Sequence, residues 1–131
     1  MKILTTIKTP GIPMWLTVFA IITFVFGTVL GLMAIFGPMP GFEHVDPSLS
    51  SSWGGRALGL GLVALFAVLL KNPYAYLVAF IGGASRDVGD IIGELQRQEP
   101  STGVLIITAL FLIASVWGIV VAYKARNPQK F

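Results

Sequence analysis

The chain has 131 residues, of which 55% are hydrophobic and only 11% are charged, and its mean hydropathy is +0.83. A soluble domain of this length exposes much of its surface and covers it with charge, so the composition excludes an ordinary soluble protein and indicates an integral membrane protein. The net charge of +3 does not indicate nucleic-acid binding, because the basic residues are sparse. With no cysteine and a single histidine, we expect neither a metal site nor a cofactor.

The first apolar run extends from Ile12 to Phe36 without a charged residue. At about 1.5 Å per residue, this run is long enough to cross a hydrocarbon core of about 30 Å. It is too long for the core of a signal peptide and ends without a clear cleavage site, so we interpret it as a retained transmembrane helix. Glycines and prolines end the run, and we predict an extracytoplasmic loop over residues 37–53.

Three more transmembrane helices are predicted, at about 54–70, 73–95 and 102–123. Because only short polar turns connect them, we predict an all-α fold, a single domain over 1–131 in which four helices form an up-down-up-down bundle. Glycines spaced four residues apart favour close helix packing, within the bundle or in a homo-oligomer. They occur in three of the helices, as the pairs Gly27 and Gly31, Gly55 and Gly59, and Gly89 and Gly93.

The charges outside the helices predict the orientation of the bundle. The predicted termini and loop on the opposite side from residues 37–53 contain no acidic residue. Their charged residues are Lys2, Lys8, Lys71, Lys124, Arg126 and Lys130. The loops on the other side contain Glu43, Asp46 and Glu99, with Arg97 as their single basic residue. By the positive-inside rule, we expect both termini in the cytoplasm, and we place this multi-pass protein in a bacterial inner membrane.

Five charged residues fall inside the predicted helices: Arg56, Arg86, Asp87, Asp90 and Glu94. Charges at membrane depth are costly, so they usually face the bundle interior, a partner charge or water. Spacings of four residues place Arg86, Asp90 and Glu94 on one stripe, with Asp87 beside it. Because Arg56 enters the membrane from the same side, we expect it within salt-bridge or one-water distance of Asp87 or Asp90.

This charged cluster has two interpretations. It forms an ion-pair lock between the second and third helices, or it lines an outward-facing pocket in which all five residues bind the head group of a ligand. His44 in the long loop is close enough in topology to cover such a pocket, although a single loop histidine is more often simply solvated. The sequence leaves both interpretations open.

Three short motifs resemble a known pattern: Gly55-Arg56-Ala57-Leu58-Gly59, Asn72-Pro73-Tyr74 and Arg86-Asp87-x-Gly89-Asp90. Together they make the chain similar to the small four-helix DoxX-like bacterial membrane proteins, over a region from Trp53 to about Tyr123. The resemblance implies the four-helix fold and the importance of Arg56, Asp87 and Asp90. The family name is associated with quinone-linked oxidation, but we transfer no reaction to this chain.

No nucleophile–base pair, phosphate loop or nucleotide fingerprint is present, so we assign no catalytic residue. We therefore expect a non-catalytic membrane protein, an accessory or scaffold subunit of a membrane complex. The alternative is a binder of a lipophilic molecule such as a quinone, another isoprenoid or a lipid, or an isomerase of such a molecule with Asp90 or Glu94 as proton carrier. A transporter is disfavoured because the charges occupy only one half of the membrane.

Overall fold

A computed structural model describes residues 2–37 and 46–126, and these residues form α-helices and no strand. The first helix is a short segment before the bundle, and the other four are long. The helices are α1 (Lys2–Ile7), α2 (Met14–Phe36), α3 (Pro47–Leu70), α4 (Pro73–Leu95) and α5 (Thr102–Ala125). The predicted all-α class is confirmed.

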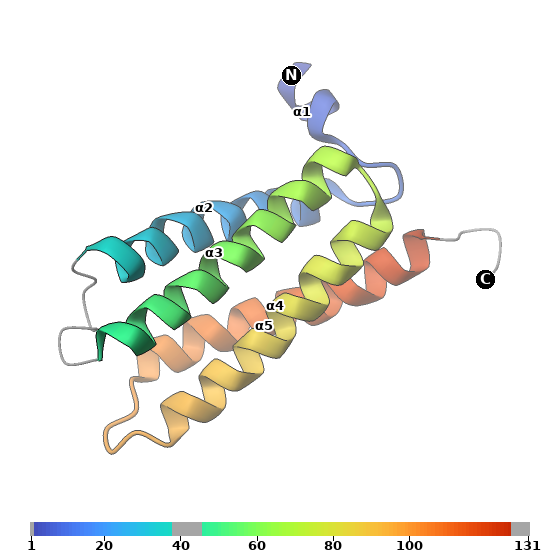
Figure 1. Ribbon diagram of the computed structural model, residues 1–131. Helices are drawn as coiled ribbons and strands as arrows, with labels where there is room; N and C mark the ends of the chain where they lie inside the picture. Colours follow the sequence, from blue (N-terminus) through green and yellow to red (C-terminus); the bar gives the residue numbers. More distant parts are fainter. Residues whose placement is uncertain (1, 38–45, 127–131) are drawn as a thin grey trace.

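The long helices alternate in direction and form two hairpins, α2 with α3 and α4 with α5 (Figure 1). The turn at Lys71 and Asn72 joins the hairpins, and α1 and the end of α5 lie at this same end of the molecule (Figure 1). We call it the turn end, and we call the opposite end, where α3 and α5 begin, the open end. The up-down-up-down bundle is therefore present as predicted.

Three of these helices, α2, α3 and α5, are long and apolar enough to cross a membrane. Large hydrophobic side chains remain exposed along their outer faces, including Val29, Phe66 and Ile113. Lipid solvates such a surface, whereas water does not, so the chain is a membrane protein. With 23 residues, α4 is as long as α2, but it carries four of the five charged residues described above, whereas Arg56 lies on α3.

The structure differs from the prediction most at the start of α3 and in the presence of α1. The second membrane helix, α3, begins at Pro47 rather than at Gly54, because Asp46 caps it and proline is tolerated in the first helical turn. Asp46 Oδ1 accepts hydrogen bonds from the Ser48 backbone N–H at 2.9 Å and from the Ser48 hydroxyl at 3.0 Å, which lowers the pKa of this carboxyl group. The short helix α1 was not predicted. His44, Glu43 and Lys130 lie outside the described residues.

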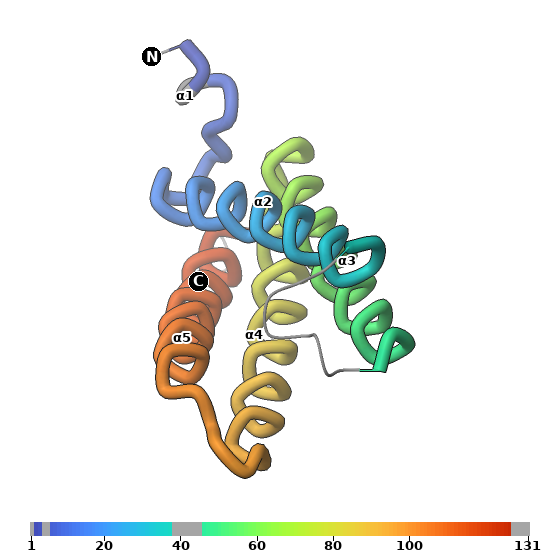
Figure 2. The backbone as a smooth tube through the Cα atoms, turned by 90° about the vertical axis from the view of Figure 1, so that its left-hand side faces the viewer, coloured from blue at the N-terminus to red at the C-terminus, as the bar shows by residue number. Residues whose placement is uncertain are grey.

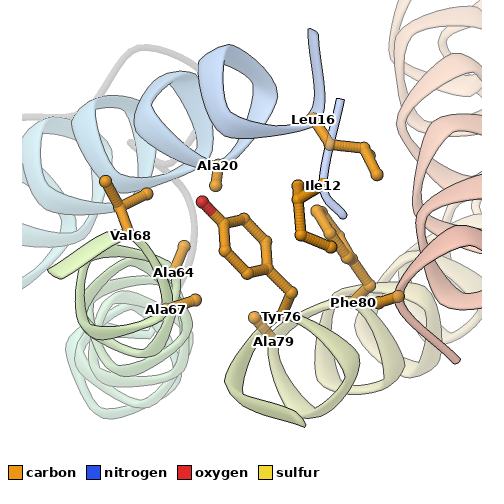
Figure 3. Packing of buried hydrophobic residues seen from close by; sticks show 10 residues of the cluster. Ile12, Leu16, Ala20, Ala64, Ala67, Val68, Tyr76, Ala79 and Phe80 are labelled. Atoms are coloured by element: carbon orange, nitrogen blue, oxygen red, sulfur yellow. The ribbon is translucent and has the colours of Figure 1, made fainter. Parts of the chain in front are cut away.

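The hydrophobic core occupies the turn end of the bundle. Its centre is Tyr76, which is fully buried and whose hydroxyl lies 3.2 Å from the hydroxyl of Thr17 on α2. Alanines from α2, α3 and α5 let the helices approach closely around this ring, as Figure 3 shows for α2 and α3. The buried cluster consists of Ile12, Leu16, Ala20, Ala64, Ala67, Val68, Tyr76, Ala79, Phe80 and Ala122.

The two hairpins separate toward the open end. Within the first hairpin the contact stays close, because a Cβ atom on Gly27 would lie 2.5 Å from the backbone oxygen of Ala57. Between the hairpins, α3 and α4 meet at the turn and are far apart at their other ends (Figure 1). This divergence leaves room in the half of the bundle that holds the charged residues.

Candidate functional site

A cavity of about 350 Å³ lies in the open-end half of the bundle, and each of the four long helices contributes to its wall. The helices diverge there, since α2 begins beside the end of α5 and then crosses over toward α3 (Figure 2). The lining residues are Thr23, Phe26, Gly27, Leu30, Trp53, Ala57, Arg86, Asp87, Asp90, Ile107, Thr108 and Phe111.

Three charged residues of α4 form the polar part of this lining. The Arg86 guanidinium donates to Asp87 Oδ1 through Nη2 at 2.8 Å and through Nε at 3.2 Å. Its Nε also lies 3.8 Å from Asp90 Oδ2, one helical turn further along α4. One arginine therefore contacts both aspartates, and the spacing of four residues places Asp90 on the same face of α4 as Arg86.

Asp87 is the most deeply placed member of this cluster, with only 2% of its surface exposed. Both hydrogen bonds from Arg86 go to its Oδ1 atom. Its Oδ2 atom is buried and has no hydrogen-bond partner in the part of the chain that the structure describes. A buried carboxylate oxygen without a donor is unfavourable, so the contacts within the bundle satisfy this carboxylate only in part.

The remaining wall is mostly apolar. Phe26 and Leu30 of α2 and Ile107 and Phe111 of α5 provide the large hydrophobic side chains. Two threonines add hydroxyl groups, and that of Thr23 already donates to the backbone oxygen of Phe19 at 2.9 Å. The cavity thus combines a charged region on α4 with hydrophobic walls on α2 and α5. This combination suits an amphipathic molecule.

Arg56, which was predicted to belong to the site, is exposed and does not line the cavity. Among the described residues no ion pair joins it to Asp87 or Asp90, although it lies close enough to Asp90 to attract it electrostatically. Arg86 takes the place expected for Arg56, because it projects from the same helix as the aspartates while α3 diverges from α4. Arg56 therefore attracts Asp90 from outside the cavity lining.

Glu94 was also predicted to bind the ligand, but it lies outside the cavity lining. Its Oε1 atom accepts a hydrogen bond from the Ser101 backbone N–H at 2.7 Å. Arg97 Nη1 donates to both of its carboxylate oxygens, at 3.1 and 3.2 Å. Glu94 therefore joins the end of α4 to the start of α5, and these contacts leave no support for a proton carrier at this position.

The residues that complete the wall were not predicted from the sequence. Trp53, for which no place in the site was predicted, lines the cavity. Thr23 and Thr108 lie in uncharged apolar runs. Their hydroxyl groups were the feature of the sequence that could have indicated an inward-facing position. Phe26 and Phe111 carry no such sign, because an aromatic side chain suits lipid, core and cavity equally well.

Comparison with known protein families, with curated proteins and with solved structures finds no match to this chain. The resemblance to DoxX-like proteins therefore stays a hypothesis that rests on the three short motifs. The description of the fold and of the cavity depends on the residues of this chain alone.

Proposed function

We propose that this protein binds a lipophilic molecule within the membrane and does not transform it. The polar head group of this molecule contacts Arg86, Asp87 and Asp90, and its apolar part lies against the walls from α2 and α5. The observation that carries the proposal is the cavity of about 350 Å³ in which this charged cluster meets hydrophobic side chains. Its volume falls in the range of small-molecule sites in proteins, about 300–1,000 Å³.

An ion-pair lock alone explains the cluster less well. A lock between α3 and α4 needs charged partners on both helices, whereas Arg86 and Asp87 are neighbours on α4. A lock also satisfies its own buried atoms, but Asp87 Oδ2 is left without a partner among the described residues. Quinones, other isoprenoids and lipids are the ligand classes that a membrane offers to such a site.

Native mass spectrometry of the detergent-purified protein tests this proposal. We expect a small molecule to remain bound to the parent protein. Thr108→Phe fills the cavity and should release the molecule, because Thr108 is a lining residue. Leu110→Phe is the matched control, since Leu110 is 61% exposed on the outer face of the same helix. A protein without any bound molecule, or equal retention by both variants, would count against the proposal.

We further propose that the protein lies in a bacterial inner membrane with both termini in the cytoplasm. The basic residues Lys2, Lys71 and Lys124 support this orientation, since they belong to the turn end of the bundle. The cavity then opens in the outer half of the membrane. The chain contains no cysteine, so single cysteines can be introduced in place of Ser51 and Asn72. Labelling from outside the cell should reach the first position only.

An accessory role in a membrane complex is the second candidate function. It is supported by Gly55 and Gly59 of α3, where a Cβ atom would meet nothing within 4 Å. Such an open glycine face lets a helix of another subunit, or of a second copy, approach closely. Replacing both glycines by leucine should remove any partner that copurifies with the protein. An unchanged set of partners would argue against this role.

A further inference from the structure

We infer that the cavity opens sideways into the lipid between α2 and α5, and that its ligand is a long-chain molecule whose chain leaves through this opening. The inference rests on the proposed function and makes its ligand class narrower. The head group occupies the cavity, while most of the chain stays in the bilayer.

Two residues of the cavity lining are also strongly exposed on the outside of the bundle. Phe26 of α2 is 55% exposed and Ile107 of α5 is 58% exposed, more than any other lining residue. A side chain that both lines a cavity and is exposed to the surroundings lies where the cavity opens. We call the opening between Phe26 and Ile107 the mouth of the cavity.

The two helices that border this mouth separate along their length. Close contacts join α2 with α3, α3 with α4 and α4 with α5. In contrast, α2 begins beside the end of α5 and then crosses over toward α3 (Figure 2). Gly27 of α2 packs against Ala57 of α3, and Phe26, one residue earlier, lies about 100° around the helix from that contact. The mouth is therefore on the side of α2 that α3 does not cover.

Aromatic rings close the cavity toward the turn end. Phe19 of α2 stacks on Phe80 of α4 with ring centroids 5.7 Å apart, and its centroid lies 5.4 Å from that of Phe111 of α5. Phe111 lines the cavity, whereas Phe80 belongs to the buried core around Tyr76. Because a protein core is closely packed, a ligand chain cannot extend from the cavity in this direction.

The charged residues border a different gap, the one between α3 and α4. Arg86 and Asp90 line the cavity from α4, and Arg56 of α3 lies close enough to Asp90 to attract it. A hydrocarbon chain in this gap would take water away from charged groups without offering them a polar partner, which is unfavourable. Phe26 and Ile107 at the mouth carry no such cost. The chain therefore leaves between α2 and α5.

The size of the cavity agrees with a chain that extends outside it. Its volume of about 350 Å³ is near the lower end of the range for small-molecule sites, about 300–1,000 Å³. A head group and the first part of a chain fill such a space. The rest of a long isoprenoid or acyl chain has to lie beyond the mouth, in contact with lipid.

Two isoprenoid alcohols with the same head group, the short geraniol and the long solanesol, test whether the chain leaves the cavity. The protein is placed in phosphatidylcholine nanodiscs, and Trp15→Phe with Trp117→Phe, both at exposed positions, leaves Trp53 in the lining as the single fluorescent reporter. Lipid solvates the outer part of the chain in the bound and the free state alike, so this part adds no affinity. Both alcohols should shift the Trp53 emission saturably, at mole fractions in the lipid that agree within about threefold.

Photolabelling tests where the chain leaves. A long-chain alcohol with a diazirine in its chain labels the residues beside that chain on illumination, and mass spectrometry identifies them. Geraniol at about ten times its half-saturating mole fraction should reduce the labelling of Phe26 and Ile107 roughly tenfold. Leu62 of α3 is the matched control, since it is 40% exposed and its neighbour Gly61 packs against Gly27 at a similar depth. Geraniol should leave the labelling of Leu62 unchanged.

A pair of variants tests whether the mouth belongs to the cavity. Thr108→Phe fills the cavity and should abolish the geraniol-sensitive labelling of Phe26, whereas Leu110→Phe on the exposed face of α5 should keep it. Sensitive labelling that persists in Thr108→Phe would overturn the inference. If Thr108→Phe does not fold, the two alcohols and the photolabelling of the protein with native Thr108 still decide it.

The outcomes separate this inference from the proposed function. Saturable binding of geraniol without binding of solanesol would indicate an enclosed cavity, which overturns the inference but keeps a lipophilic site. Geraniol-sensitive labelling between α3 and α4 instead of at Phe26 and Ile107 would do the same. The absence of saturable binding by both alcohols, together with labelling that geraniol does not change at any residue, would overturn both.

Discussion

Asp87 and Glu94 are two buried acids on the same helix, seven residues apart, and the structure uses them differently. Glu94 has donors for both oxygens, from the Ser101 N–H group and Arg97. Asp87 has donors for one oxygen only, and its other oxygen stays unpaired among the described residues. Glu94, whose contacts are complete, joins two elements of the fold, whereas Asp87 lines the cavity and has contacts to one of its oxygens only.

The largest expected effect comes from removing the partner of Asp87. Arg86→Leu would leave Asp87 as an uncompensated buried charge and should destabilise the bundle by about 3–5 kcal/mol. Urea unfolding of the protein in detergent micelles, followed by circular dichroism, measures this loss. A midpoint equal to that of the parent protein would mean that Arg86 does not stabilise a buried charge at Asp87.

A smaller loss of stability is expected at the other acid. Glu94→Ala removes the acceptor for the Ser101 N–H group, but this group lies at the start of α5, where water or lipid head groups can replace the acceptor. The same unfolding assay should give a lower midpoint than the parent but a higher one than Arg86→Leu. Ligand retention in native mass spectra should not change. Loss of the bound molecule would place Glu94 in the site after all.

Replacing Arg97, the arginine that pairs with Glu94, should reduce the stability still less. Arg97 is 61% exposed, so its ion pair is screened by solvent and Arg97→Ala should cost only about 0.2–1 kcal/mol. The effect should shrink further in high salt, because exposed charge pairs are screened. A loss similar to that of Arg86→Leu would remove the contrast between the two acids.

The smallest change in stability is expected when both members of the cavity pair are removed together. Arg86→Leu combined with Asp87→Leu eliminates two desolvation penalties at once, while Asp90, which also loses Arg86, is more exposed and keeps the attraction of Arg56, so the stability should stay close to that of the parent. The bound molecule should nevertheless be lost. Retention of the ligand by this double variant would show that the head group is held elsewhere.

Much of the fold was predictable from the sequence. The third helix was predicted at 73–95 and is observed at Pro73–Leu95, because Asn72 and Pro73 give a clear start signal. The start of α3 was predicted too late, since the serine-rich segment after Pro47 was taken as loop. The capping residue Asp46 and the proline after it were the signals that could have corrected this boundary.

The candidate site was predictable only in part. Helical spacing correctly joined Arg86 to Asp90, since both lie on one stripe of α4. The same stripe also suggested Glu94, but the turn into α5 takes that residue away from the cavity. Arg56 was expected to pair with an aspartate of α4, but no ion pair joins them in the described part of the chain.

The sequence alone determined the membrane character, the long helices and their alternating order, because these depend on local properties such as the length of apolar runs and the shortness of turns. It also determined that the charges gather in one half of the bundle. Only the tertiary structure decided which acid faces a cavity. That choice depends on where the helices approach closely and where they diverge, and the close approach of Gly27 on α2 to Ala57 on α3 is one such contact. These positions are distant in the chain, and no local pattern relates them.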